Sequence, residues 1–327
     1  MRILTNVKID WLRWRWHTLA LSWLIILSGL SLMGTRGVPL GIDFSGGTLV
    51  VLEFDQPVTE EAVRTALASV PGEKVVQRYG EPGENQILIR MPQTTEQERG
   101  ASLEQQATAI VDTLRKGNVG SFEVLSTDIV GPVIGEDLQR RGIYATIAAL
   151  FGIMLYIALR FRLSFGLGAM TASVHDVLIT LSFLVFAGYE LSLNVIAAIL
   201  TLVGYGVNDQ IVIFDRVREN LRTNRREPMN VVINKSVNQT LPRTVITAGT
   251  TALSVTALYL FGGEVLEPFA FTMLVGIITS TYSTVFIASA IAVLLSDRRR
   301  SVAAATAPAA TAAPVRPGRK SGRARAS

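Results

Sequence analysis

Residues 191–214 read LSLNVIAAILTLVGYGVNDQIVIF, a run of apolar and small residues interrupted by the polar pair Asn208 and Asp209. A helix of about 20 such residues crosses the hydrocarbon core of a bilayer, so the run predicts a membrane-spanning helix. An ionised carboxylate at the centre of such a helix costs about 2.5–3.5 kcal/mol on insertion scales. Asp209 is therefore expected either to be functional or to be a packing carboxyl that accepts hydrogen bonds from Asn208 or Tyr205.

Five further apolar runs predict an α-helical membrane protein with a bundle of six spans. Hydrophobic residues make up 49% of the 327 residues and charged ones 17%, and the apolar residues concentrate in the runs. The predicted spans are residues 18–35, 142–160, 164–187, 191–214, 243–262 and 266–295. No small-x-small cleavage site follows the first run, which predicts an uncleaved anchor rather than a signal peptide.

Basic residues predict the orientation of the bundle. Arginines flank one set of span ends, as at Arg160 and Arg216, whereas the connections AGYE and GGEVLEP contain neither Lys nor Arg. The positive-inside rule then predicts cytoplasmic termini, residues 1–17 and 296–327, and an outer segment, residues 36–141. The chain has no cysteine, so the outer segment must fold around a hydrophobic core without disulfides.

The outer segment has the pattern of a small α+β domain. Alternating runs such as GTLVVLEF and helical spacing between them give the order β-α-β-β-α-β, with the second helix at about residues 96–116. This order predicts a ferredoxin-like domain, a four-stranded antiparallel sheet covered by two helices. The segment offers no metal or nucleophile arrangement, so we expect it to bind a polypeptide or a partner rather than to catalyse a reaction.

The sequence GIDFSGGTLV at residues 41–50 precedes the first strand of this domain. It has no P-loop Lys and no following helix, which argues against a phosphate site. Gly46 and Gly47 are expected to allow a tight bend between the first span and the sheet. Asp43, two residues after Gly41, is expected to accept hydrogen bonds from nearby backbone amides.

Other polar residues also fall within the predicted spans. Asp176 lies roughly 18 Å along the third span by helix rise, next to His175, and both functional and packing roles remain open for this pair. Arg243, after the helix-starting Pro242, either extends its side chain to the membrane surface or reaches the region of Asp209. Gly204 and Gly206 are expected to let another helix approach closely. The hydroxyl residues nearby either line a water-filled proton path or help the helices pack. They are Thr244, Thr247, Thr250, Thr251, Thr279, Ser280, Thr281, Ser283 and Thr284.

Two segments are assigned to the cytoplasmic side. Residues 215–242 begin with Asp215 and Glu219, expected in solvated ion pairs, and continue as a short amphipathic helix on the membrane surface. The tail at residues 296–327 is low in complexity and basic, and it accounts for the net charge of +5. It is expected to be disordered and to contact anionic lipid, with ribosomal RNA or another acidic partner as the alternative. For the chain as a whole, no nucleic acid is an expected partner.

Several stretches together resemble the SecD/SecF family of bacterial protein-export membrane proteins, within the RND superfamily. They are GIDFSGGT, HDV, GYGVNDQIVIFDRVREN, SVNQTLPRTVITAGTT and LFGGEVLEPFAFTMLVGIITSTYSTVFIAS, and the match runs from about residue 2 to residue 297. The resemblance implies half of an RND-type transporter in the bacterial inner membrane that pairs with SecD. Further implied partners are the SecYEG channel, SecA, YajC and an unfolded secreted polypeptide.

By the same resemblance, the proton motive force drives the export step, and the chain is neither an enzyme nor the holder of a cofactor or metal. The family's membrane carboxylate falls on Asp209 and its partner arginine on Arg243. Asn208, Asp176 and Thr247 are further candidates for the proton path because of their positions in or near the predicted spans. This chain has Gly206 and Gln210 where the family commonly has hydroxyl residues, which places fewer hydroxyls beside the acid.

Three alternatives stay open at this point. Asp176 and Asp209 could form the carboxylate pair of an intramembrane aspartyl protease, although the Gly-x-Gly-Asp motif of that class is absent. A small-molecule exporter of the same superfamily would usually carry twelve spans in one chain. A structural assembly factor without ion coupling would not depend on Asp209 or Arg243.

Overall fold

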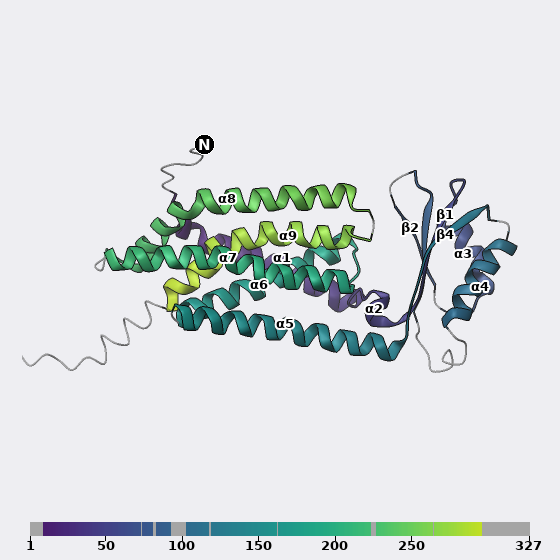
Figure 1. Ribbon diagram of the computed structural model, residues 1–327, viewed down its shortest axis with the longest axis horizontal. Coiled ribbons are helices and arrows are strands. Elements are labelled where there is room, and N and C mark those ends of the chain that lie inside the picture. The colour runs from purple at the N-terminus through teal and green to yellow at the C-terminus, as the bar shows by residue number, and fades with distance from the viewer. Residues whose placement is uncertain are drawn as a thin grey trace, which may run out of the picture.

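The computed structural model describes residues 9–72, 74–80, 83–92, 103–117, 119–161, 163–223, 227–263 and 265–295. Figure 1 shows a long bundle of helices with a small sheet domain at one end. We call the end of the bundle nearest this domain the sheet end, and the opposite one the far end. The tail at residues 296–327, predicted to be disordered, lies outside the described residues.

Six helices in the described part of the chain are long and apolar enough to cross a membrane, as the sequence predicts. They are α1 (Arg15–Arg36), α5 (Pro132–Arg160), α6 (Leu163–Ala187), α7 (Leu193–Thr223), α8 (Met229–Phe261) and α9 (Glu267–Ser283). A 3-10 turn, η1 (Trp11–Trp14), precedes α1, and a π-helical turn, η4 (Thr284–Ala288), follows α9. The helices α5, α7 and α8 extend well past the predicted spans.

The six helices divide into an inner and an outer group. Within the most apolar stretch of each helix, the buried share of residues is 56% in α6, 50% in α7 and 67% in α9. The corresponding share is only 17% in α1 and 11% in both α5 and α8. Small residues permit the close inner packing: a Cβ on Gly168 of α6 would lie 2.9 Å from the carbonyl oxygen of Ala288. The space that can shelter polar side chains is therefore bounded by α6, α7 and α9.

The prediction that a helix begins at Pro242 is wrong, because α8 starts at Met229 and continues through the proline. A proline inside a helix removes one backbone hydrogen bond, and tertiary contacts compensate here. The prediction of a short amphipathic helix on the membrane surface is also wrong. The apolar residues of the first half of α8 are buried in the protein core instead. They are Met229, Val232, Ile233 and Val237.

The start of the chain also fastens this half of α8. The backbone N–H of Trp11 donates to Oδ1 of Asn234 at 2.9 Å, and its indole Nε1 donates to Oδ1 of Asn238 at 2.9 Å. Buried side chains hold one face of α8, and these hydrogen bonds hold another. We infer that the helix continues through Pro242 because of these contacts.

The sheet domain consists of β1 (Gly47–Phe54), α3 (Glu60–Ala66), a 3-10 turn η2 (Leu67–Ser69), β2 (Val75–Tyr79), β3 (Gln86–Pro92), α4 (Leu103–Lys116) and β4 (Phe122–Val130). The order β-α-β-β-α-β is the predicted one, and the antiparallel strands lie in the order β2-β3-β1-β4. The first residues of the second predicted helix, 96–102, lie outside the described part.

One face of the sheet carries the core of this domain. Val50, Leu52 and Phe54 of β1 pack with Ile110 and Leu114 of α4, and all five are nearly inaccessible to solvent. The helices α3 and α4 lie on the face of the sheet turned away from the bundle (Figure 1). The other face therefore points toward the membrane helices, and a short helix, α2 (Ile42–Ser45), lies between the two parts.

Gly47 begins β1 in a conformation that other residues rarely adopt. Its φ is 130°, and a Cβ at this position would lie 2.4 Å from the carbonyl oxygen of Met91 on β3. Gly46 before it has a φ of 70°. The two glycines therefore let the chain turn into the sheet directly against its neighbouring strand.

We expect Gly47→Ala to lower the free energy of unfolding by about 1–3 kcal/mol from backbone strain alone. The matched control is Gly131→Ala, since Gly131 has a φ of −68° and open space around its missing Cβ. Thermal unfolding of both purified variants in detergent provides the measurement. Equal melting temperatures for the two would contradict this account of Gly47.

Candidate functional site in the helix bundle

Asp209 lies on the inward face of α7 and is 4% exposed. Its Oδ2 atom has no hydrogen-bond partner, and no hydrogen bond joins its carboxyl to Asn208 or Tyr205 among the described residues. Asn208, the next residue back, points outward and is exposed. The alternative in which Asp209 is a hydrogen-bonded packing group therefore lacks the contacts that it requires.

Asp176 on α6 is buried as well, but its carboxyl is fully engaged. Oδ1 lies 3.0 Å from Nδ1 of His175, and Ser283 of α9 donates a hydrogen bond to Oδ2 at 2.7 Å. The ring of His175 stacks against that of Tyr282, with centroids 6.2 Å apart. This second acid is thus linked to α9 through two neighbouring residues.

Gly206 connects the two acids spatially. A Cβ on this α7 residue would lie 2.4 Å from Oγ of Ser280 and 3.9 Å from Oδ2 of Asp176, and Asp209 follows it by about one helical turn. No hydrogen bond joins the carboxyls of Asp176 and Asp209 in the described structure. They are two separate acids along one interior, not a pair sharing a proton at about 3 Å as in aspartic proteases.

Several buried polar atoms of the bundle also have no hydrogen-bond partner within the described part of the chain. Gln210 is completely buried with both amide atoms unpaired, and the same holds for the hydroxyls of Thr180, Thr244, Ser280 and Thr284. Sequence reasoning treated Gln210 only as a departure from a family pattern, and it missed Thr180. The spacing in the sequence could have identified Thr180, because it follows Asp176 by four residues and therefore lies on the same face of the helix.

The π-helical turn η4 was not predicted either. It begins directly after Ser283, and Oγ of Ser289 donates to the carbonyl oxygen of Thr284 at 3.0 Å. Such turns widen a helix by one residue and occur frequently at functional sites. No local sequence signal distinguishes TVFIA from ordinary helix, so only the structure places this irregularity beside the second acid.

The predicted arginine lies on the other side of α7 from Asp176. Arg243 of α8 interacts electrostatically with Asp209, but the described residues contain no direct ion pair between them. Arg243 is exposed, Thr247 is half-buried, and a Cβ on Gly204 would meet open space. The site is therefore enclosed by α6 and α9 on one side and open on the side of α8.

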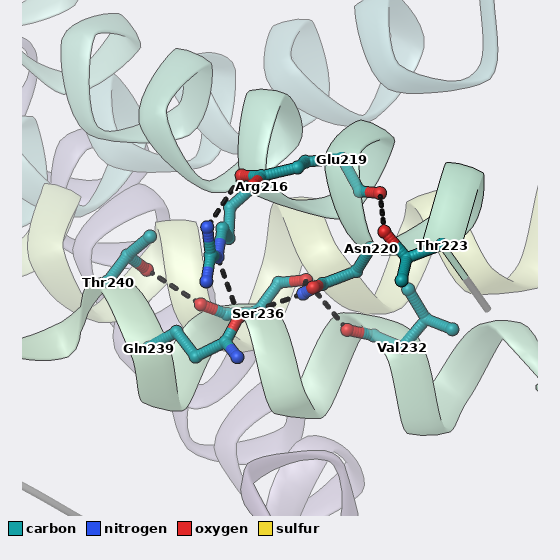
Figure 2. A network of polar contacts seen from close by, with 8 residues as sticks. All are labelled: Arg216, Glu219, Asn220, Thr223, Val232, Ser236, Gln239 and Thr240. Atoms are coloured by element: carbon teal, nitrogen blue, oxygen red, sulfur yellow. Dashed lines mark hydrogen bonds and ion pairs between the residues drawn. The ribbon is translucent and has the colours of Figure 1, made fainter.

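A polar network at the far end fixes α7 against α8 (Figure 2). Asn220 donates from Nδ2 to Ser236 Oγ and to Gln239 Oε1, both at 2.9 Å, and Arg216 donates from Nε to the same Gln239 atom at 2.7 Å. Gln239 precedes Arg243 by one turn, and Arg216 follows Asp209 by two. The network thereby fixes the position of Arg243 along the axis of α7.

The exposed charges near this network form the solvated ion pairs that were predicted. Arg216 pairs with Glu219 at 2.6 Å, and Arg160 lies 3.8 Å from Asp215. The side chains of Asp215 and Glu219 are 62% and 63% exposed. Pairs this accessible add little stability, so we assign them no role in the site.

The glycine-rich motif lies elsewhere. Gly41, Asp43, Gly46 and Gly47 are at the sheet end, near Leu193, about 24 Å from Asp209 by the rise of α7. Asp43 does accept a hydrogen bond from a backbone N–H, but that N–H belongs to Leu193, 150 residues away, rather than to a neighbouring residue. Among the described residues, no group of three or more His, Asp or Glu side chains could hold a metal ion.

Six membrane-length helices, with two ionisable acids sheltered among the inner three and a polar side open to the surroundings, define an integral membrane protein with a polar interior. Comparison with known proteins specifies it further. The chain belongs to the SecD/SecF family: the family described as "Protein export membrane protein SecD/SecF, C-terminal" matches residues 110–298, and the "SecD/SecF GG Motif" matches residues 31–58.

Similar proteins extend along most of the chain. One from Desulfurispirillum indicum, named protein translocase subunit SecF, is 44% identical over 294 residues, covering 89% of this chain and 92% of the relative. Another of that name, from Escherichia coli O157:H7, is 36% identical over 291 residues, covering 89% and 88%.

A solved structure resembles the fold as well. It is that of SecDF, a translocon-associated membrane protein from Thermus thermophilus, with a TM-score of 0.78 and 33% identity. The match covers 91% of this chain but only 40% of SecDF. SecDF in its super-membrane-facing form matches with a TM-score of 0.68. The likeness to part of SecDF supports a partnership with SecD.

We expect Asn220→Ala to destabilise the pairing of α7 and α8 by about 1–3 kcal/mol, because it removes both Asn220 hydrogen bonds from a buried network. Thr223→Ala is the control, since Thr223 is exposed and bonds within its own helix. Thermal unfolding of the two variants is the measurement. If both unfold like the unmodified protein, the network does not hold the two helices together.

Proposed function

We propose that this chain acts as a SecF-type translocase subunit that, together with SecD, uses the proton motive force to complete the translocation of secreted polypeptides. The observation that carries the proposal is Asp209, a buried carboxyl whose Oδ2 atom has no hydrogen-bond partner among the described residues. A buried acid of this kind in a membrane bundle is costly and is usually kept for function. Family membership supplies the process in which that function takes place.

In this proposal, Asp209 binds and releases the proton. Arg243 favours its ionised form by electrostatic attraction, and Asn208 and Thr247 supply polar groups on the open side. The unpaired amide of Gln210 and the nearby hydroxyls offer hydrogen-bonding positions for water between the acid and its surroundings. Asp176, already engaged by His175 and Ser283, is a second acid on the same path.

The open side of α7 and α8 is where we place SecD. Gly204 and Asn208 are exposed there, and α5 and α8 present apolar surfaces that the chain itself does not cover. The proposed setting is the bacterial inner membrane with both termini in the cytoplasm, so that the sheet domain lies outside and contacts the emerging polypeptide. SecYEG is the channel served, and SecA and YajC are further proposed partners.

The alternatives fit the site less well. An aspartyl protease needs two carboxyls that share a proton, and Asp176 and Asp209 are not joined in this way. A small-molecule exporter finds no support in relatives that are named translocase subunits. An assembly factor without ion coupling would have no use for an unpaired buried acid.

We expect Asp209→Asn to abolish the part of translocation that depends on the proton motive force, because an amide cannot take up a proton. Arg243→Ala should weaken the same part, while copurification with SecD persists. Asp215→Asn is the control, an exposed acid on the same helix six residues later. The assay follows late translocation of a secreted precursor into membrane vesicles with and without a proton gradient, and normal gradient-dependent export in Asp209→Asn would refute the proposal.

A further inference from the structure

A joint of three segments connects the sheet domain to the start of α7. Residues 39–43 run beside the loop between α6 and α7 and form one parallel bridge with it, Leu40 to Leu191. The N–H of Leu191 donates to the carbonyl oxygen of Pro39 at 2.7 Å, and that of Gly41 donates to the carbonyl oxygen of Leu191 at 2.8 Å. A Cβ on Gly41 would lie only 3.1 Å from that oxygen, so the glycine permits the approach.

The sheet itself takes part in the joint through Arg90 of β3. Its guanidinium bonds Oε1 of Glu190 at 2.7 Å and the carbonyl oxygen of Leu40 at 2.9 Å, so that one side chain contacts both other segments. The two side chains are only 16% and 28% exposed. Burial raises the pKa of Glu190, and the neighbouring Arg90 opposes the rise.

Asp43 forms the link to the helix that carries Asp209. Its Oδ2 atom accepts a hydrogen bond at 2.8 Å from the N–H of Leu193, the first residue of α7, and Ser192 Oγ accepts one from Val195 at 3.3 Å. The first amides of a helix have no partner within it, and a carboxylate there is favoured by the helix dipole. Asp43 thus holds α7 from outside the helix.

The short helix α2, which contains Asp43, is itself fixed against α5. A Cβ on Gly135 of α5 would lie 2.9 Å from the carbonyl oxygen of Phe44 and 3.2 Å from the nitrogen of Gly46. Backbone contact this close leaves little room for α2 to slide. Asp43 is therefore a fixed point rather than a loosely placed surface acid.

We propose that Asp43, Arg90 and Glu190 are positioning residues that lock the sheet domain to the first turn of α7, so that domain and helix move as one body. The lock itself follows from the contacts above. Its consequence for export rests on the proposed function: a movement of α7 that accompanies protonation of Asp209 is transmitted directly to the sheet domain. No catalytic or proton-binding role is assigned to these three residues.

The first experiment measures whether the joint closes. Because the chain has no cysteine, Leu40→Cys with Leu191→Cys introduces one pair, and a parallel bridge places its Cα atoms within disulfide range. Disulfide formation is followed in native membranes containing the full complex. We expect Arg90→Glu and Asp43→Ala to slow it about tenfold, the scale expected for losing one hydrogen bond to a charged group.

Two rescues separate positioning from general damage. The exchange Arg90→Glu with Glu190→Arg should restore the rate, and Asp43→Asn should retain more of it than Asp43→Ala, because an amide oxygen still accepts the N–H of Leu193. Arg78→Glu on neighbouring β2, where the side chain is exposed, controls for the charge change and should have no effect. Unchanged rates in Arg90→Glu and Asp43→Ala, or no rescue by the exchange, would overturn the lock.

The second experiment tests movement as one body. Export driven by the proton gradient is measured in the Leu40→Cys, Leu191→Cys double variant with its introduced thiol pair reduced and oxidised, and we expect equal rates. Loss of export on oxidation, restored by reduction, would mean that the joint must open and would overturn the proposal. Asp209→Asn keeps the two proposals distinguishable: normal export in that variant refutes proton coupling, whereas the disulfide rates test the lock on their own.

Discussion

The cost of burying an ionisable acid in an apolar bundle is the constraint on which this structure depends. Asp209 can exist at its depth only where polar groups and other helices surround it, and the three inner helices provide that space. Small residues make the space possible, since Gly168 and Gly206 let neighbouring helices approach to backbone or hydroxyl contact. The outer helices are free of this demand and present apolar surfaces instead.

The helix that carries the acid is held by polar contacts at both ends, from a distant segment at the sheet end and from the next helix, α8, at the far end. Asp43 binds its first amide at the sheet end, and Asn220 and Arg216 bind α8 at the far end. Between them α7 is a continuous helix, which transmits displacement along its axis better than a loop. Both anchors are polar because the helix ends reach beyond the apolar zone, and at the far end the Asn220–Ser236 hydrogen bond is itself buried.

Much of this arrangement could be predicted from the sequence, because membrane spans and alternating strands leave strong periodic signals. The six spans, the β-α-β-β-α-β order and the buried position of Asp209 follow from hydropathy and spacing. The errors arise where tertiary contacts override a local signal: Pro242 does not start a helix, and Met229 lies in the core instead of on a membrane surface. The joint at Arg90 and the π-turn η4 leave no local signal, since each depends on residues brought together only by the fold.

The two faces of α7 differ in how closely the rest of the chain covers them. Toward α6 and α9, the neighbourhood of Gly206 is closely packed and contains the engaged acid Asp176. On the opposite face, Gly204 and Asn208 are exposed, and Arg243 approaches Asp209 without an ion pair among the described residues. Asp209 itself is only 4% exposed, but the exposed polar residues Asn208 and Arg243 beside it would be costly in lipid, so this face requires a second set of helices. The chain corresponds to only 40% of SecDF, and the remainder of such an assembly is what we expect to supply that second face.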